Sequence, residues 1–571
     1  MLSHIIKRFP FVFSIIAVVA IGCTRNKTPI QPNVSSDLPS LFITIPSEQL
    51  DIIHNDKESK VPGQALLITS DQDTLYDGNL TYIKTRGNTT WSSTKKPYNI
   101  KFPRKQRFLD LYASKSFVLL ANSMDESHIR NAIAFDLAHA IGLPAPRYTF
   151  ISLYINGKYK GLYQMTNKVG VGKHTLNITD LDKLNKQENP LPTDSYTWFG
   201  YGRKKGIIQR KGMLLENDPE DITGGYLLDN SGMDWIYRKS ESGFVSDSGD
   251  PIRIRSPKYA SLNEVEYIAN LYNQMEAAIM SDDGYNPQTG KHYSEYIDVE
   301  SFARYYLLNE LLLNQDGGFV SFFMYKDADV FDSKIYAGPI WDFDKSLMSP
   351  SCNNEIIVYN EIYVGSEIGK IHIEAGRIDE PHSGGLLYHL TQHDDFQCVV
   401  KNYYYNEISP ICHDYIANGK IDILSNALYH EAEKDNHLYT WLRKSSDYFA
   451  ATNAAKDFLE SRLKFLDWYF SASENDMICI EYKSENKKPH ERKIHIYYPT
   501  NEPVHPPLHV KSHSGSYKHL PVFELYLYGT DSIITDGTIF HSPQLLELRE
   551  REPTWKEVQL RRIQKNLGKW K

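Results

Sequence analysis

Residues 314–344 of the chain read NQDGGFVSFFMYKDADVFDSKIYAGPIWDFD. Two strand-like runs, Val320–Tyr325 and Lys334–Ile340, lie between an acidic residue at Asp316 and an acidic cluster at Asp342 and Asp344. A phosphoryl-transfer site needs a carboxylate beside the acceptor hydroxyl and further carboxylates to hold Mg²⁺ on the phosphates; in protein kinases these two parts also flank a hairpin. The stretch therefore indicates metal-dependent phosphoryl-transfer chemistry.

Each acidic position also has a structural interpretation. Asp316 precedes Gly317 and Gly318, as in an ordinary Asp-Gly turn. The two acids of Trp341–Asp344 are also compatible with a solvated loop packed by two aromatic residues. A hydrolase that uses Asp342 and Asp344 as paired carboxylates is a further alternative, although no acid/base motif of that class accompanies them.

The chain before this stretch changes its pattern several times. Apolar residues alternate in short runs over Leu41–Phe102, which predicts a β-rich opening. A helix is expected from Asp125 to Ile141, and then a hairpin over Tyr148–Met165 that turns at Asn156-Gly157. Residues 183–216 are polar and aperiodic, which predicts a loop or insertion.

Helical periodicity dominates the later part of the chain. After a strand-like run at Gly224–Leu228, helices are predicted over Leu262–Ala278 and Val299–Leu313, and mainly helical structure over Tyr388–Phe470. Alternating strands return beyond residue 475. The order of elements predicts an α+β protein with a divergent two-lobed protein-kinase-like fold over residues 40–473, and a small β-rich C-terminal appendage over 474–571.

The first residues resemble an export signal. Lys7 and Arg8 precede the apolar run Phe9–Ile21, which ends in small residues before Cys23. This run is shorter than the ~20 residues of a spanning helix, so a permanent transmembrane anchor is the less favoured alternative. Residues 1–22 are therefore expected to be a lipoprotein signal peptide, with lipid attached at Cys23 and a flexible tether over residues 23–39.

Composition excludes some classes of function. The net charge is −8 without a basic stripe, which argues against a nucleic-acid partner. Besides Cys23 the chain has Cys352, Cys398, Cys412 and Cys479 without a CxxC pair, so a zinc knuckle is disfavoured. One or two disulfides and four free thiols both remain open.

Six segments resemble, in the same order, the signature segments of the CotH (spore coat protein H) kinase family, and the resemblance runs over roughly residues 40–470. They are Arg86–Trp91, Lys95–Phe102, Leu120–Asn131, Tyr154–Tyr163, Gly224–Leu228 and Trp341–Asp344. The resemblance implies an atypical protein kinase that uses ATP and a divalent ion, Mg²⁺, to phosphorylate Ser or Thr hydroxyls.

The resemblance also implies roles for individual residues. Asp316 would be the catalytic residue that orients the acceptor, and Asp342 the main Mg²⁺ ligand with Asp344 assisting. Ser321 stands five residues after Asp316, where a kinase catalytic loop has a metal-binding Asn, and its hydroxyl can bind Mg²⁺.

The expected nucleotide-binding residues come from the β-rich part of the chain. At least one of Arg86, Lys96 and Lys101 is expected to reach the phosphates, although either lysine also fits a solvated strand face. Thr166 and Lys168 stand where a nucleotide hinge would lie after the hairpin.

The expected partner is a protein substrate in the cell envelope, and the expected location is a membrane surface outside the cytoplasm, reached through the lipid anchor. ATP is not assured in that compartment. The competing hypothesis is a catalytically inactive, kinase-like scaffold that binds an envelope protein or a polysaccharide.

Overall fold

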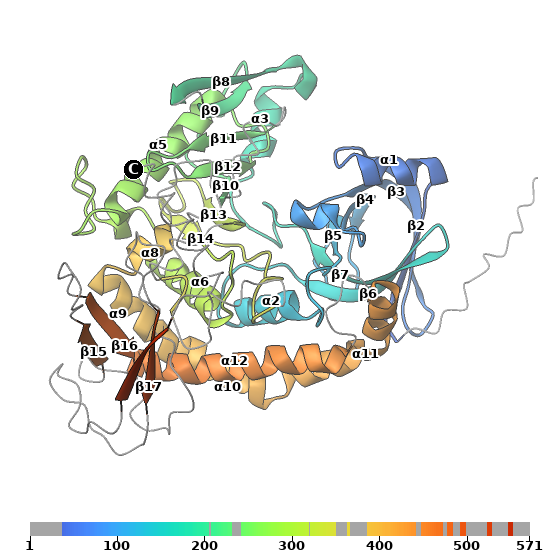
Figure 1. Cartoon of the computed structure of the whole chain (residues 1–571). Helices are drawn as coiled ribbons and strands as arrows, with labels where there is room; N and C mark the ends of the chain where they lie inside the picture. Colours follow the sequence, from blue (N-terminus) through green and yellow to red (C-terminus); the bar gives the residue numbers. More distant parts are fainter. Residues whose placement is uncertain are drawn as a thin grey trace, which may run out of the picture. The chain divides into compact units, whose positions relative to one another are not determined.

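The computed structural model describes the elements shown in Figure 1. The described residues are 37–204, 207–230, 241–318, 320–349, 362–365, 385–440, 447–471, 477–482, 492–497, 522–527 and 546–551. Cys23, the expected signal peptide and nearly all of the expected tether lie outside them.

The first strands close into a barrel. Its strands follow the order β1–β2–β3–β4–β5–β7–β6, and β1 pairs with β2 in antiparallel and with β6 in parallel orientation. Apolar side chains such as Ile43, Ile83 and Phe117 are fully buried inside it. The strands are β1 (Ser40–Thr44), β2 (Val61–Ile68), β3 (Thr74–Thr85), β4 (Tyr98–Gln106), β5 (Ser114–Leu120), β6 (Tyr148–Ile155) and β7 (Lys158–Asn167), with α1 (Ser47–Asn55) between β1 and β2 and the 3₁₀ turn η1 (Thr89–Ser92) between β3 and β4.

The predicted hairpin is confirmed. β6 and β7 pair along their whole length. Asn156 and Gly157, which connect the two strands, have φ values of 51° and 75°. These are the left-handed conformations of a type I′ turn, which asparagine and glycine tolerate best. Asn156 also joins the turn to β1, because its Oδ1 accepts a 2.9 Å hydrogen bond from the amide of Ile45.

The helix expected from Asp125 begins later, as α2 (Arg130–Ala140). The carboxylate of Asp125 accepts hydrogen bonds from the backbone amides of Ser127 (2.9 Å) and Arg130 (3.0 Å). Asp125 therefore satisfies amides at the helix start, as a capping carboxylate does, and is not part of the helix itself. The apolar side of α2 packs into the large core of the later elements and not into the barrel core.

A second sheet is antiparallel throughout, in the order β14–β13–β10–β12–β11–β9–β8. Its strands are β8 (Thr197–Lys204), β9 (Ile207–Leu214), β10 (Tyr226–Asn230), β11 (Ser242–Val245), β12 (Pro251–Ser256), β13 (Phe322–Lys326) and β14 (Ile335–Ala337). The strand pair between the two acidic positions is thus confirmed as β13 and β14. The loop predicted over residues 183–216 is wrong, because α3 (Leu181–Glu188), η2 (Thr193–Ser195) and the hairpin β8–β9 fill it.

The predicted helices are confirmed. α5 begins with a capping box in which Ser261 and Glu264 each bond the other's backbone amide. A buried ion pair joins two other helices, because Nη2 of Arg462 on α12 lies 2.6 Å from Oε1 of Glu310 on α6. The helical elements are α5 (Leu262–Ile279), η3 (Tyr293–Glu295), α6 (Val299–Leu311), α8 (Leu386–Leu390), α9 (Asp394–Tyr403), the π-helical turn η4 (Tyr404–Ile408), α10 (Ser409–Ala417), α11 (Lys420–Leu438) and α12 (Tyr448–Ser471).

Helix α11 is fastened to the barrel by a buried polar contact. Nζ of Lys95 lies 2.6 Å from Oδ1 of Asp435, and neither side chain is exposed. The same two groups also bond to the backbone of Leu162 on β7. A buried charge pair with added hydrogen bonds fixes how the two elements meet.

The C-terminal strands form two antiparallel pairs. They are β15 (Met477–Tyr482) with β16 (Arg492–Tyr497), and β17 (Val522–Leu527) with β18 (Leu546–Arg551). The domain boundary expected near residue 474 stays a prediction. Among the described residues, no helix is both long and apolar enough to span a membrane.

The two-lobed kinase-like α+β fold predicted from the sequence is wrong. The opening β region does not form a lobe that packs the helix expected from Asp125: its strands close into a barrel through the β1–β6 pairing, and α2 belongs to the other core. The later part is not a mainly helical lobe with a short strand pair, because β13 and β14 are the edge of a larger antiparallel sheet.

Candidate functional site

The segment Trp341–Ser346, here called the acidic segment, directly follows β14 and its short connection. Trp341 and Phe343 are buried, whereas Asp342 between them is only half-buried. Asp342 holds a φ of 68°, which is uncommon for a residue other than glycine. Its Oδ2 accepts a 3.2 Å hydrogen bond from the hydroxyl of Ser321, so the structure places these two predicted metal ligands together.

Asp316 lies after α6, and Lys345 of the acidic segment binds it. Nζ of Lys345 is 3.3 Å from the Asp316 carboxylate, whose side chain is 18% exposed. Burial raises the pKa of Asp316, Lys345 opposes this effect, and the charge of Asp342 adds to it. Asp316 and Asp342 are therefore within electrostatic range of each other.

Asp344 is the most buried of the three carboxylates, which together are called the acidic cluster (Asp316, Asp342 and Asp344). Burial raises its pKa, and the charges of Asp342 and Asp316 raise it further. A buried carboxylate beside two others favours a bound cation or a proton.

Arg86 brings a positive charge from the barrel to this cluster. It directly follows β3, and its guanidinium lies over the indole ring of Trp341 at 5.3 Å from the ring centroid. Burial lowers the pKa of Arg86, and the charge of Asp342 acts in the opposite direction. Of the three basic residues expected to reach the site, Arg86 is the one with contacts to the acidic segment.

The two lysines expected to assist Arg86 make other contacts. Nζ of Lys96 donates a 2.5 Å hydrogen bond to the carbonyl of Trp91 and lies over that residue's ring. Nζ of Lys101 on β4 lies over the ring of Tyr82. These contacts are with Trp91 and Tyr82 and not with the acidic segment, and a phosphate-binding role for either lysine stays a prediction.

The two predicted hinge residues, Thr166 and Lys168, lie in different environments. Thr166 is fully buried in β7, with β5 on one side and β6 on the other, so its backbone belongs to the barrel. The next residue, Asn167, binds both backbone polar groups of Tyr112 with its side-chain amide, at 2.9 Å each. Lys168, which follows the strand, is exposed to solvent.

Lys168 belongs to a group of positive charges that sequence reasoning missed. Although water reaches its side chain, desolvation by the surrounding protein lowers the pKa of Lys168 to about 8, and the charge of Arg255 adds to this effect. The charge of Arg255 also lowers the pKa of Arg86. The charges that lower the pKa of Lys168 belong to Arg255, Lys84, Lys258 and Arg253, and together with Lys168 these residues are called the basic cluster.

A signal for the basic cluster was present in the sequence. Residues 251–256 read PIRIRS, in which Ile252 and Ile254 alternate with Arg253 and Arg255. Alternation of this kind predicts a strand with one apolar and one basic face. The segment is β12, and Arg255 on it is 29% exposed, with Asp229 as a distant partner at 3.7 Å.

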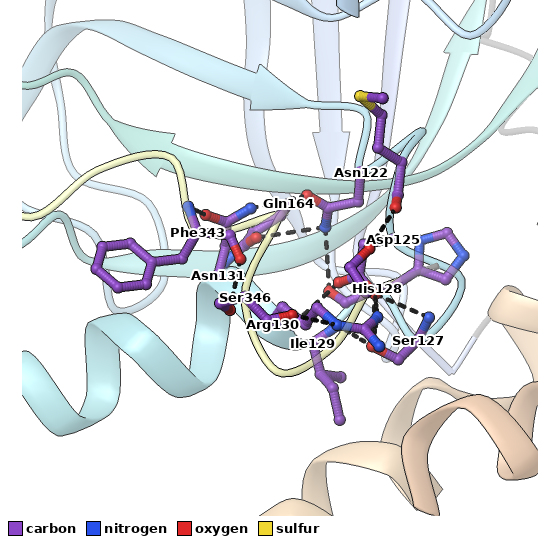
Figure 2. A network of polar contacts seen from close by, with 12 residues as sticks. Asn122, Asp125, Ser127, His128, Ile129, Arg130, Asn131, Gln164, Phe343 and Ser346 are labelled. Atoms are coloured by element: carbon purple, nitrogen blue, oxygen red, sulfur yellow. Dashed lines mark hydrogen bonds and ion pairs between the residues drawn. The ribbon is translucent and has the colours of Figure 1, made fainter. Parts of the chain in front are cut away.

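The start of α2 also contacts the acidic segment (Figure 2). Oδ1 of Asn131 accepts a 2.8 Å hydrogen bond from the amide of Phe343, and Nε of Arg130 donates a 3.0 Å bond to the carbonyl of Ser346. Both α2 residues are buried. These contacts lie next to Asp342 and Asp344 without involving their carboxylates.

The acidic cluster fits a magnesium ion that is completed by its substrate. Among the described residues, no group of three or more His, Cys, Asp and Glu side chains forms a ready-made metal site. Mg²⁺ does not require one, because it is usually bound by one or two carboxylates together with waters and substrate phosphates. The mutual repulsion around the buried Asp344 carboxylate is what such a cation would relieve.

Comparison with known proteins assigns the chain to a family. No curated protein matches the chain. The family model described as CotH kinase protein matches residues 83–466, a range that includes the acidic cluster, Arg86 and the basic cluster, and it indicates a kinase-like function. Because this range covers more than half of the 571 residues, the chain belongs to the CotH kinase protein family.

Proposed function

We propose that this protein is an atypical kinase that uses ATP and Mg²⁺ to phosphorylate Ser or Thr hydroxyls of a protein in the cell envelope or outside the cell. The observation that carries the proposal is the acidic cluster, in which Ser321 binds Asp342 and Lys345 binds Asp316, with Arg86 placed over the Trp341 ring of the same segment. Carboxylates for a metal beside cations for phosphate are the two parts that phosphoryl transfer requires. The barrel-containing fold does not oppose the proposal, because function depends on the site and not on the fold.

Asp342 and Asp344 would hold the metal ion. The hydroxyl of Ser321 fixes one oxygen of Asp342, which leaves its other oxygen for the cation. When bound, Mg²⁺ supplies positive charge that neutralises the β- and γ-phosphates.

Asp316 would act on the acceptor. Its raised pKa makes it a better proton acceptor than an ordinary Asp, and its bond to Lys345 fixes its orientation. The acceptor oxygen forms a bond to the γ-phosphorus while the bond from that phosphorus to the bridging oxygen breaks. The hydroxyl proton passes to Asp316, and ADP leaves.

Arg86, Lys168 and Arg255 would hold the phosphates. The guanidinium of Arg86 is oriented by the ring of Trp341, next to Asp342 in the chain. Arginine offers several donors in a planar arrangement that matches phosphate oxygens. Lys168 and Arg255 extend the positive charge for a polyanion such as a triphosphate.

Thermal unfolding tests this proposal directly. The parent protein is expected to gain stability with ATP and Mg²⁺ together, and to gain much less with ATP and EDTA. Transfer of labelled γ-phosphate to the protein itself or to envelope proteins then tests for catalysis. A protein that ATP and Mg²⁺ or Mn²⁺ leave unstabilised would refute the kinase proposal and favour the inactive scaffold.

We also propose that the protein is exported and held at a membrane surface by lipid on Cys23. The support is the charged, apolar and small-residue pattern before Cys23. Replacement of Cys23 by Ala is expected to move the protein from the membrane fraction to the soluble fraction. If Cys23→Ala remains in the membrane fraction in the same amount, the anchor is not at this residue.

A further inference from the structure

Asn131 binds the backbone of the acidic segment between its two carboxylates. Its Oδ1 accepts the hydrogen bond from the amide of Phe343, the residue that separates Asp342 from Asp344. Asn131 is 4% exposed and Phe343 is fully buried, so water cannot replace this bond. The position of the Phe343 amide determines where the neighbouring carboxylates project.

Arg130 binds the other end of the segment. Its Nε donates to the carbonyl of Ser346, while its Nη1 binds the carboxylate of Asp125 and donates a 3.0 Å bond to the hydroxyl of Ser127. The guanidinium is therefore held in a fixed plane by the turn before α2. Asn131 and Arg130, which are adjacent in the chain, thus bind the backbone of the acidic segment at Phe343 and at Ser346.

The barrel supports these two residues. Nδ2 of Asn122 donates to the carbonyl of His128 (3.1 Å) and to Oε1 of Gln164 on β7 (3.3 Å), and Nδ2 of Asn131 is directed at Oδ1 of Asn122 at 3.5 Å. Figure 2 shows that this network extends from the barrel strand to the acidic segment. The start of α2 is therefore fixed relative to the barrel that also supplies Arg86.

The acidic segment needs such support because its backbone is strained. Asp342 has a φ of 68°, and Leu347 and Met348, directly after the segment, have φ values of 48° and 49°. Non-glycine residues keep such conformations only where the surrounding structure imposes them. Asn131 is uncharged, and Arg130 binds the carboxylate of Asp125, so both residues contact the acidic segment through its backbone.

We propose that Asn131 and Arg130 are positioning residues that hold Asp342 and Asp344 in the geometry that binds a divalent cation. Partners that orient metal ligands in this way commonly contribute 10- to 100-fold to metal affinity. The part of this inference that concerns the cation depends on the proposed function, whereas the part that concerns the order of the segment does not.

Two measurements on the full chain test it: hydrogen–deuterium exchange of peptides that cover residues 341–346, and the affinity for Mn²⁺. Asn131→Leu removes the acceptor for Phe343, and exchange in these peptides should become about tenfold faster or more. Mn²⁺ affinity should fall about 10- to 100-fold. Asn131→Asp keeps the acceptor oxygen for Phe343 but loses the donor to Asn122, so its exchange should lie between that of the parent and that of Asn131→Leu.

Asn189→Leu is the matched control. Asn189 is also a buried amide that holds a loop, because it binds the backbone amides of Glu216 and Asn217 and the carbonyl of Asn217. Its loss should speed exchange near residues 215–217 and leave Mn²⁺ affinity unchanged. Asn131→Ser, a smaller and polar replacement that is too short to reach Phe343, serves if Asn131→Leu does not fold.

The outcomes separate the two proposals. Unchanged exchange over residues 341–346 in Asn131→Leu or Asn131→Ser, or an equal loss of Mn²⁺ affinity in Asn189→Leu, would overturn the positioning role. A parent protein that binds no Mn²⁺ with or without nucleotide would refute the proposed function and the cation part of this inference, while the exchange comparison still decides whether Asn131 orders the segment.

Discussion

The hydroxyl of Ser321 donates a 3.2 Å hydrogen bond to Oδ2 of Asp342, and both residues have a positive φ, of 58° and 68°. These two backbone positions flank the β13–β14 pair at the edge of the second sheet. The contact therefore joins the residues that follow Asp316 to the start of the acidic segment. It leaves the other carboxylate oxygen of Asp342 without this restraint.

Arg86 should matter for nucleotide binding and Lys101 should not. Arg86→Ala removes a charge next to Asp342, and the loss of a charge-assisted phosphate bond, about 1.5–3 kcal/mol, should weaken nucleotide affinity by tenfold or more. Lys101→Ala removes an equal charge from β4, where Lys101 lies over Tyr82. Affinities measured by calorimetry in the presence of Mg²⁺ compare the two; an equal loss in both variants would contradict the assignment of Arg86 to the site.

Much of the local structure could be predicted from the sequence, because local chemistry determines it. Asn156-Gly157 specifies a hairpin turn, and Ser261 with Glu264 specifies the start of α5. The barrel could not be predicted in the same way. Its closure depends on the pairing of Ile43 with Ile155, which are far apart in sequence and carry no mark of their partner.

The same distinction applies to the site. Asp316, Ser321 and Asp342 flank one strand pair, so their proximity follows from a local pattern. Arg255 was missed because it comes from β12, on a different part of the sheet. Lys96 and Lys101 were chosen by residue type and strand position, and a strand position alone does not determine which face of a closed barrel a side chain occupies.

Nucleotide affinity should depend on pH through Lys168. Because the protein environment lowers the pKa of Lys168 to about 8, this side chain is charged below that pH and loses its charge as the pH rises through it. Nucleotide affinity should therefore fall between pH 7 and pH 9. Lys168→Arg, which stays charged, should remove this part of the pH dependence; parallel pH profiles for the parent and the variant would exclude Lys168 from the phosphate site.

The lowered pKa of Lys168 should also affect the stability of the protein. This effect should increase with pH, whereas nucleotide affinity should fall. The unfolded chain binds the Lys168 proton more tightly than the folded protein does, so the contribution of this residue to the stability of the nucleotide-free protein should increase from about pH 8 toward the ordinary lysine pKa of 10.5. Urea unfolding at several pH values, compared between the parent and Lys168→Met, measures it. A parent that gains less stability than the variant over this range would contradict the sign.

The Lys95–Asp435 pair should be essential for the attachment of α11 to the barrel. Lys95→Met leaves the Asp435 carboxylate buried without its main counter-charge, and a loss of about 3–5 kcal/mol in the free energy of unfolding is expected. The double variant Lys95→Met/Asp435→Leu removes both charges and should lose less than the single variant. Urea denaturation tests this; if the double variant is the less stable of the two, the pair is not the source of the effect.

The most direct test of the kinase assignment compares Asp342→Asn with Asp316→Asn in the same two assays, nucleotide affinity with Mg²⁺ and transfer of labelled γ-phosphate. Asp342→Asn should abolish metal-dependent nucleotide binding, because it removes the main charge that holds the cation. Asp316→Asn should bind nucleotide as the parent does and lose about 10²–10⁴-fold in turnover, the usual contribution of a positioned base. Full turnover in Asp316→Asn, or unchanged metal-dependent binding in Asp342→Asn, would contradict the account.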